Sequence, residues 1–184
     1  NVGLRGLSVE DGGVMWKHDW DIGQMARVTQ PLVVGNAVYL GTGYGNGTQR
    51  VNVSHQSDSW AVEESWIAAL KPYFNDFVHH DGHLYGFDNE IFVSIDAETG
   101  ERNWKRGRYG NGQVLLVAEM GLLLVISEKG KIVLLEASPD QHQELLSIEA
   151  VEGVTWNHPV IAGGVLLVRN DREMAAFRLA SLNN

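Results

Sequence analysis

A short hairpin closed by a tryptophan is the feature that most restricts how this chain can fold. Its clearest copy opens with Ile91–Ile95, whose β-branched and aromatic residues favour a strand. Asp96 follows with a side chain that can start a turn, and Gly100 stands where a hairpin loop needs a positive φ. Trp104 ends the returning strand and supplies a large apolar anchor.

The chain contains this hairpin more than once. Near the N-terminus, Ser8 and Gly12 precede Trp16 by eight and four residues, the same spacing as in the clearest copy. Weaker copies end at Trp66 and near Leu145. A recurrence of roughly 40–50 residues fits a propeller blade, a kelch unit or an armadillo-type helical repeat. The strand-forming residues exclude the helical repeat.

A second recurring device is a tight turn between two short strands. Its residue pairs are those that tolerate the positive φ of such turns. The turns are Gly35-Asn36, Asp81-Gly82 and Gly163-Gly164, and a looser one surrounds Glu119-Met120-Gly121. Each repeat then holds this first hairpin, a third strand such as Val51–Ser54, and a fourth strand such as Ala61–Trp66. Four antiparallel strands in roughly 40 residues are the pattern of a propeller blade.

We therefore expect an all-β fold, a β-propeller of four-stranded antiparallel blades with about four units, in one domain spanning residues 1–184. The chain either closes a small ring with its N-terminal strands or is a partial propeller, half of a seven- or eight-bladed ring. Four-bladed rings lie at the lower end of the known range, which favours the half. A homodimer would then cover the open edge strands. The expected units are approximately 1–19, 25–66, 73–106, 111–148 and 155–180.

Composition excludes several classes of function. The net charge is −9 and no Lys/Arg cluster is present, so the chain lacks the means to bind nucleic acid. There are no cysteines, which excludes disulfides, thiolate catalysis and cysteine-based zinc sites. No apolar run approaches the roughly 18–20 residues of a membrane-spanning helix.

The clearest hairpin resembles the repeat of quinoprotein (PQQ-like) β-propellers, whose pattern is Ala-x-Asp-x-x-Thr-Gly-x-x-x-Trp. Ser94 stands at its Ala, Asp96 at its Asp, Thr99-Gly100 at its Thr-Gly and Trp104 at its Trp. The chain is similar to the C-terminal part of bacterial PQQ-like repeat proteins. The resemblance implies seven or eight blades and a periplasmic or secreted location. The residues expected to close the blades are Trp16, Trp66 and Trp104, with Asp96 and Gly100.

Polar side chains precede each first strand and are the best candidates for a ligand-binding surface. Innermost strands line the channel of a propeller, so their starting ends converge on one face. The same side chains can instead satisfy backbone groups at the strand ends and hold channel water. Trp156 is the candidate for stacking on a ligand. The candidates are Gln30, Asn75, Asp76, Gln113, Trp156, Asn157 and His158.

A metal site is not expected. His80 and His83 flank the Asp81-Gly82 turn and face each other across the hairpin, but a tetrahedral site needs three or four convergent ligands. His142 lies in a polar loop and is expected to be solvated. The glycine-rich stretch 41–47 lacks the lysine and the following helix of a phosphate-binding loop.

Two classes of function follow, and neither assigns a catalytic residue. In the first, the chain is a non-catalytic scaffold that binds a protein partner or a small ligand. In the second, it is part of a PQQ- and Ca²⁺-dependent alcohol dehydrogenase, and both cofactors follow from the resemblance alone. Asp76, Asn75 and Asn157 would then offer oxygen ligands to the ion. The disulfide common beside that cofactor is excluded without cysteine. We prefer the scaffold.

Overall fold

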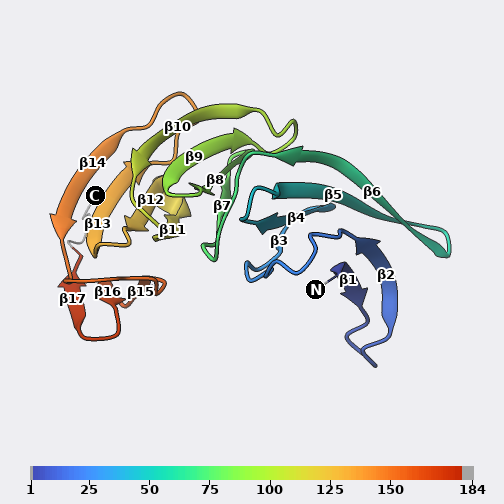
Figure 1. Ribbon diagram of the computed structural model, residues 1–184, viewed down its shortest axis with the longest axis horizontal. Coiled ribbons are helices and arrows are strands. Elements are labelled where there is room, and N and C mark those ends of the chain that lie inside the picture. The colour runs from blue at the N-terminus through green and yellow to red at the C-terminus, as the bar shows by residue number, and fades with distance from the viewer. Residues whose placement is uncertain (1, 180–184) are drawn as a thin grey trace.

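The computed structural model describes residues 2–179 and contains five antiparallel sheets within that range. Residue 1 of the first expected unit and residue 180 of the fifth lie outside the described residues. Figure 1 shows the sheets following one another along an open arc, with β6, β10 and β14 on its outer rim. This confirms the prediction of an all-β partial propeller built from four-stranded antiparallel blades.

The sheets are numbered here from first to fifth in chain order. The first holds β1 (Gly3–Leu7) and β2 (Val14–Asp19), and the second holds β3 (Leu32–Val34), β4 (Ala37–Thr42), β5 (Gly47–Gln56) and β6 (Ser59–Ala68). The third holds β7 (Val78–His80), β8 (His83–Asp88), β9 (Ile91–Asp96) and β10 (Arg102–Arg108). The fourth holds β11 (Gln113–Val117), β12 (Leu122–Ile126), β13 (Lys131–Glu136) and β14 (Glu144–Glu149), with a 3-10 turn η1 (Ala118–Met120). The fifth holds β15 (Val160–Ala162), β16 (Val165–Arg169) and β17 (Met174–Arg178).

Both faces of the middle strands are buried in the second, third and fourth sheets, because each of these sheets packs between two others. Successive side chains of a strand point to opposite faces. In β12, Leu123 and Val125 therefore enter the core shared with the third sheet, while Leu124 and Ile126 enter the core shared with the fifth. Two further cores join the first sheet to the second and the second to the third. Apolar burial between neighbouring sheets thus holds the arc together.

The tight turns have the backbone that their residues predict. Gly35 has a φ of 57°, and Asp81 and Gly82 have φ values of 45° and 79°. The looser turn of the fourth sheet ends at Gly121, with a φ of 60°.

The hairpin of β5 and β6 is longer than expected. Its strands have ten residues each, and the turn at its tip contains Ser57 with a φ of 55°. The pairing continues out to Gln56 and Ser59. The ring of Trp60 packs on His55 near the tip, with the centroids 4.6 Å apart.

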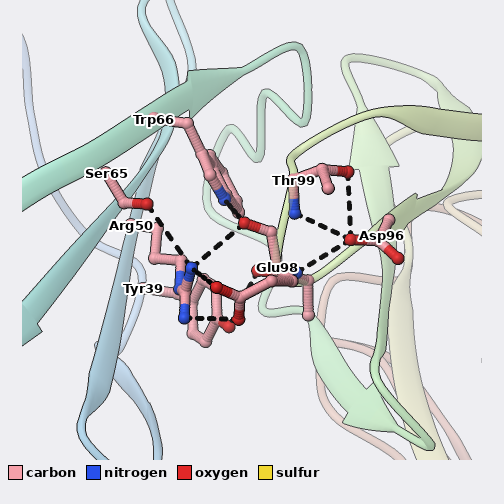
Figure 2. A network of polar contacts seen from close by, with 8 residues as sticks. Tyr39, Arg50, Ser65, Trp66, Asp96, Glu98 and Thr99 are labelled. Atoms are coloured by element: carbon pink, nitrogen blue, oxygen red, sulfur yellow. Dashed lines mark hydrogen bonds and ion pairs between the residues drawn. The ribbon is translucent and has the colours of Figure 1, made fainter.

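Trp66 joins the second sheet to the third, as Figure 2 shows. Its Nε1–H donates to the carbonyl oxygen of Glu98, 2.9 Å away in the β9–β10 turn. A Cβ added to Gly100 of that turn would lie 2.8 Å from the indole. Asp96 shapes the turn by accepting hydrogen bonds from the backbone N–H groups of Glu98 and Thr99. The tryptophan of one sheet therefore packs on the glycine turn of the next sheet.

Of the two other tryptophans expected to close blades, Trp104 contacts the next sheet as Trp66 does, whereas Trp16 does not. Trp104 Nε1–H donates to the carbonyl oxygen of Ser138 in the fourth sheet, at 2.9 Å. Trp16 instead covers Gly6 of its own sheet, where an added Cβ would lie 2.1 Å from Nε1. The next sheet offers it no glycine turn, because the β5–β6 hairpin ends in Ser57 and Asp58.

An ion pair that the sequence did not reveal lies beside Trp66 in Figure 2. The guanidinium of Arg50 contacts both carboxylate oxygens of Glu98, at 2.8 and 2.6 Å. Tyr39 donates its hydroxyl to the carbonyl oxygen of Ala97, at 3.0 Å. The second and third sheets are thus joined by polar contacts as well as by their core.

The expectation that His142 is solvated is wrong. Its side chain is 9% exposed, because residues of the third sheet cover it. The ring packs edge-on against Trp104, and Nε2 lies 2.8 Å from the Tyr109 hydroxyl. This burial lowers the pKa of His142.

Candidate functional site

The starting ends of the four innermost strands carry polar residues at one structurally equivalent position. The last residue pairs of the first hairpins are Val34↔Ala37, His80↔His83, Val117↔Leu122 and Ala162↔Val165. Four residues before the first member of each pair stand Gln30, Asp76, Gln113 and His158. Alternation of strand direction puts these ends on the face that also carries the β4–β5 and β12–β13 turns. We call it the entry face.

Hydrogen bonds connect these side chains from sheet to sheet. The Gln30 backbone N–H donates to Asp76 Oδ1 at 3.1 Å, and the Asp76 N–H donates to Gln113 Oε1 at 3.2 Å. Gln113 Nε2 then donates to the carbonyl oxygen of Trp156 at 3.2 Å. His158 Nε2 lies 3.4 Å from Asp76 Oδ2, an ion pair whenever the imidazole is protonated. Five of the seven candidate residues take part in these contacts, and the exceptions are Asn75 and Asn157.

The two asparagines differ. Asn75 is fully buried, donating Nδ2–H to the carbonyl oxygen of Gly112 at 2.5 Å and accepting from the Tyr73 N–H at 3.1 Å. Asn157 is half-buried, and its side chain makes no hydrogen bond to any residue from 2 to 179. Asn75 therefore satisfies backbone groups at the strand ends, which was the predicted alternative to ligand binding.

A pocket of about 240 Å³ opens beside Asp76 and His158. Burial alone would raise the pKa of Asp76, but the hydrogen bonds from His158 and the Gln30 amide outweigh it and lower that pKa. The carboxylate is thus held charged within a largely apolar lining. The lining residues are Gln30, Pro31, Leu32, Asp76, Phe77, Val78, Val114 and His158.

An exposed row of aromatic rings lies on the entry face and was not predicted. Centroids are 4.8 Å apart for Tyr44 and Tyr73, 5.5 Å for Tyr73 and Phe74, and 5.1 Å for Phe74 and Trp156. Tyr44, Tyr73 and Trp156 are 43%, 41% and 52% exposed. Glu128 Oε1 accepts the indole N–H of Trp156 at 2.9 Å and so fixes that ring. We call these four residues the aromatic row.

The residues suggested as Ca²⁺ ligands do not fit that ion. Both polar atoms of the Asn75 amide already have partners within the protein, so this residue has no oxygen left for an ion. Among residues 2–179, no group of three or more His, Asp or Glu side chains is placed to hold a metal. The anionic quinone fits no better, because the pocket presents a carboxylate and no Lys or Arg in its lining.

Comparison with known proteins identifies the fold. The sequence matches no protein-family model and no curated protein. The crystal structure of BamB from Moraxella catarrhalis aligns with a TM-score of 0.69 and 14% identity, over 98% of this chain and 52% of that one. The computationally designed Ika8 protein aligns with a TM-score of 0.68 and 9% identity, over 95% and 52%. The chain has the β-propeller fold and spans about half the length of these structures.

Proposed function

We propose that this chain is a non-catalytic β-propeller scaffold that binds another polypeptide through its entry face. The observation that carries the proposal is the aromatic row. Exposed aromatic side chains gathered in one place are typical of protein-binding surfaces, where they supply most of the binding energy. The row is also rigid, because the Phe74 and Trp156 rings are packed and Glu128 holds the indole.

The polar chain at the strand ends supports a scaffold rather than an enzyme. Asp76, Gln113 and Asn75 use their polar atoms to connect neighbouring sheets. A catalytic acid or base needs a lone pair or a proton available to a substrate. These contacts keep the face in one shape, which lowers the entropic cost of binding.

Selection from a library of displayed random peptides tests the proposal. We expect peptides that bind the unaltered protein and lose at least tenfold in affinity when Tyr73 and Trp156 are both changed to Ser. Trp60→Ser is the control, because Trp60 is 39% exposed and lies on the β5–β6 hairpin instead. Peptides that bind equally to all three proteins would contradict the proposal.

The dehydrogenase alternative is tested by adding PQQ and Ca²⁺ and following dye-coupled oxidation of alcohols. We expect no retained cofactor and no turnover, because Asn75 is used within the protein and residues 2–179 contain no group of three acidic or His side chains placed to hold the ion. Turnover that depends on both PQQ and Ca²⁺ would refute the scaffold proposal in favour of the dehydrogenase.

We also propose a homodimer that extends the arc. Among residues 2–179, β17 pairs only with β16, and Met174 and Val160 of the fifth sheet are 68% and 51% exposed. A second copy would cover this sheet. Light scattering should give the mass of two chains, and a stable monomer would rule the dimer out. A periplasmic or secreted location rests on the resemblance to quinoprotein propellers alone.

A further inference from the structure

We propose that the pocket beside Asp76 receives a basic side chain, Arg or Lys, of an extended polypeptide segment that lies along the aromatic row. The inference rests on the proposed function and names the chemistry of the partner. It follows from the charge in the pocket, from the shape of its lining, and from its connection to the row.

The carboxylate of Asp76 has capacity left for a ligand. An ionised carboxylate offers about four acceptor sites. Asp76 receives one backbone hydrogen bond, from Gln30, and the contact with His158 at 3.4 Å is long. Its side chain remains 33% exposed. Apart from the imidazole of His158, the lining contains no basic side chain that could pair with this carboxylate.

Charge and shape both select a long cationic side chain. The protein has a net charge of −9, which attracts basic segments. Pro31, Leu32 and Val114 form apolar walls of a pocket of about 240 Å³. Lys and Arg suit such a place, because their methylene groups bury against apolar atoms while the head group reaches a carboxylate.

The pocket and the aromatic row share two connections between sheets, β6–β7 and β14–β15. Phe74 stands two residues before Asp76, and Trp156 stands two residues before His158. The side chain of Gln113 links the Asp76 amide to the Trp156 carbonyl. Neighbouring rings of the row are 4.8 to 5.5 Å apart. An extended segment directs alternate side chains to one side, so it can place two of them on the row and a third, basic one in the pocket.

Two acetylated pentapeptide amides, Phe-Gly-Phe-Gly-Arg and Phe-Gly-Phe-Gly-citrulline, test the inference by calorimetric titration, because their alternate side chains point to one side. Citrulline has the shape of arginine without its charge. We expect the arginine peptide to bind at least tenfold more tightly to the unaltered protein. Asp76→Asn should abolish this preference, because the amide keeps an acceptor for Gln30 and loses the charge. Asp171→Asn, an exposed acid in the β16–β17 turn, is the matched control and should keep the preference.

Each other outcome overturns the inference. Equal affinity for the two peptides on the unaltered protein would do so without any variant, even if Asp76→Asn failed to fold. Butylguanidinium binding as tightly as the arginine peptide would show a site for a free cation, not for a segment. Peptides selected by the aromatic row but insensitive to Asp76→Asn would refute the pocket and leave the proposed function standing. If no peptide bound to the aromatic row of the unaltered protein, both the pocket inference and the proposed function would be refuted.

Discussion

The indole of Trp66 occupies the space that a side chain at Gly100 would need. The two residues belong to adjacent sheets, and an added Cβ at Gly100 would lie 2.8 Å from Trp66 Cδ2. Gly100 also has a φ of 75° and follows the Asp96 turn. Glycine is thus required twice at this position, once by the backbone and once by the neighbouring sheet.

Gly100→Ala should destabilise the protein by about 3 kcal/mol, from about 1 kcal/mol of left-handed backbone strain and about 2 kcal/mol of overpacking against Trp66. Gly35→Ala is the matched control, because its φ is 57° and no atom lies within 4 Å of the added Cβ. It should cost about 1 kcal/mol. Urea unfolding measures both, and equal losses would show that the indole does not constrain the turn.

Trp66→Phe should lower the free energy of unfolding by about 1 kcal/mol beyond the loss of ring area, the net worth of one hydrogen bond. The change removes the indole N–H donor, and the Glu98 carbonyl keeps only its hydrogen bond from Arg50 Nη1, at 3.0 Å. Trp60→Phe removes an indole on the hairpin of β5 and β6 and should have almost no effect. Equal losses of unfolding free energy for Trp66→Phe and Trp60→Phe, measured by urea unfolding, would show that the indole hydrogen bond does not help to hold the second sheet on the third.

A double-mutant cycle with Arg50→Met and Glu98→Gln should give a coupling of about 1 kcal/mol. We expect a small coupling free energy because the Glu98 side chain is 78% exposed and solvent screens the ion pair. Added salt should reduce the coupling. A coupling of zero at low salt would mean that the core alone joins the second and third sheets.

The contribution of Asp76 to stability should depend on pH. Its pKa in the folded protein is lowered from 3.8, so the folded state favours the charged form. The stabilisation is present above the unfolded pKa and disappears as the pH falls through the folded pKa. Wild-type protein should therefore exceed Asp76→Asn in stability at about pH 7, with the difference shrinking below about pH 4. A difference that stays constant down to low pH would contradict the assigned pKa direction.

The architecture was predictable because its signals are local. Alternating strands, tight turns and a Trp at fixed spacing from Gly lie within about 15 residues of one another, and they sufficed to predict antiparallel blades. Equivalent positions before each first strand then marked Gln30, Asp76, Gln113 and His158, which the structure places at one end of the innermost strands.

The parts that the sequence did not reveal depend on contacts between distant segments. Tyr44, Phe74 and Trp156 come from three connections, and nothing local shows that their rings meet. Polar neighbours suggested that His142 is solvated, whereas Trp104 and Tyr109 of the preceding sheet cover it. Arg50 and Glu98 are 48 residues apart and pair only because two sheets face each other.

Cores shared only between adjacent sheets give the molecule nearest-neighbour cooperativity. The second, third and fourth sheets have a core on either side, whereas the first and the fifth each contribute to one. Opening should start at both ends of the arc and progress inward, so backbone amides of β8 and β12 should exchange with solvent most slowly. Any partner that covers an end sheet would slow this fraying and hold the central sheets in register for longer.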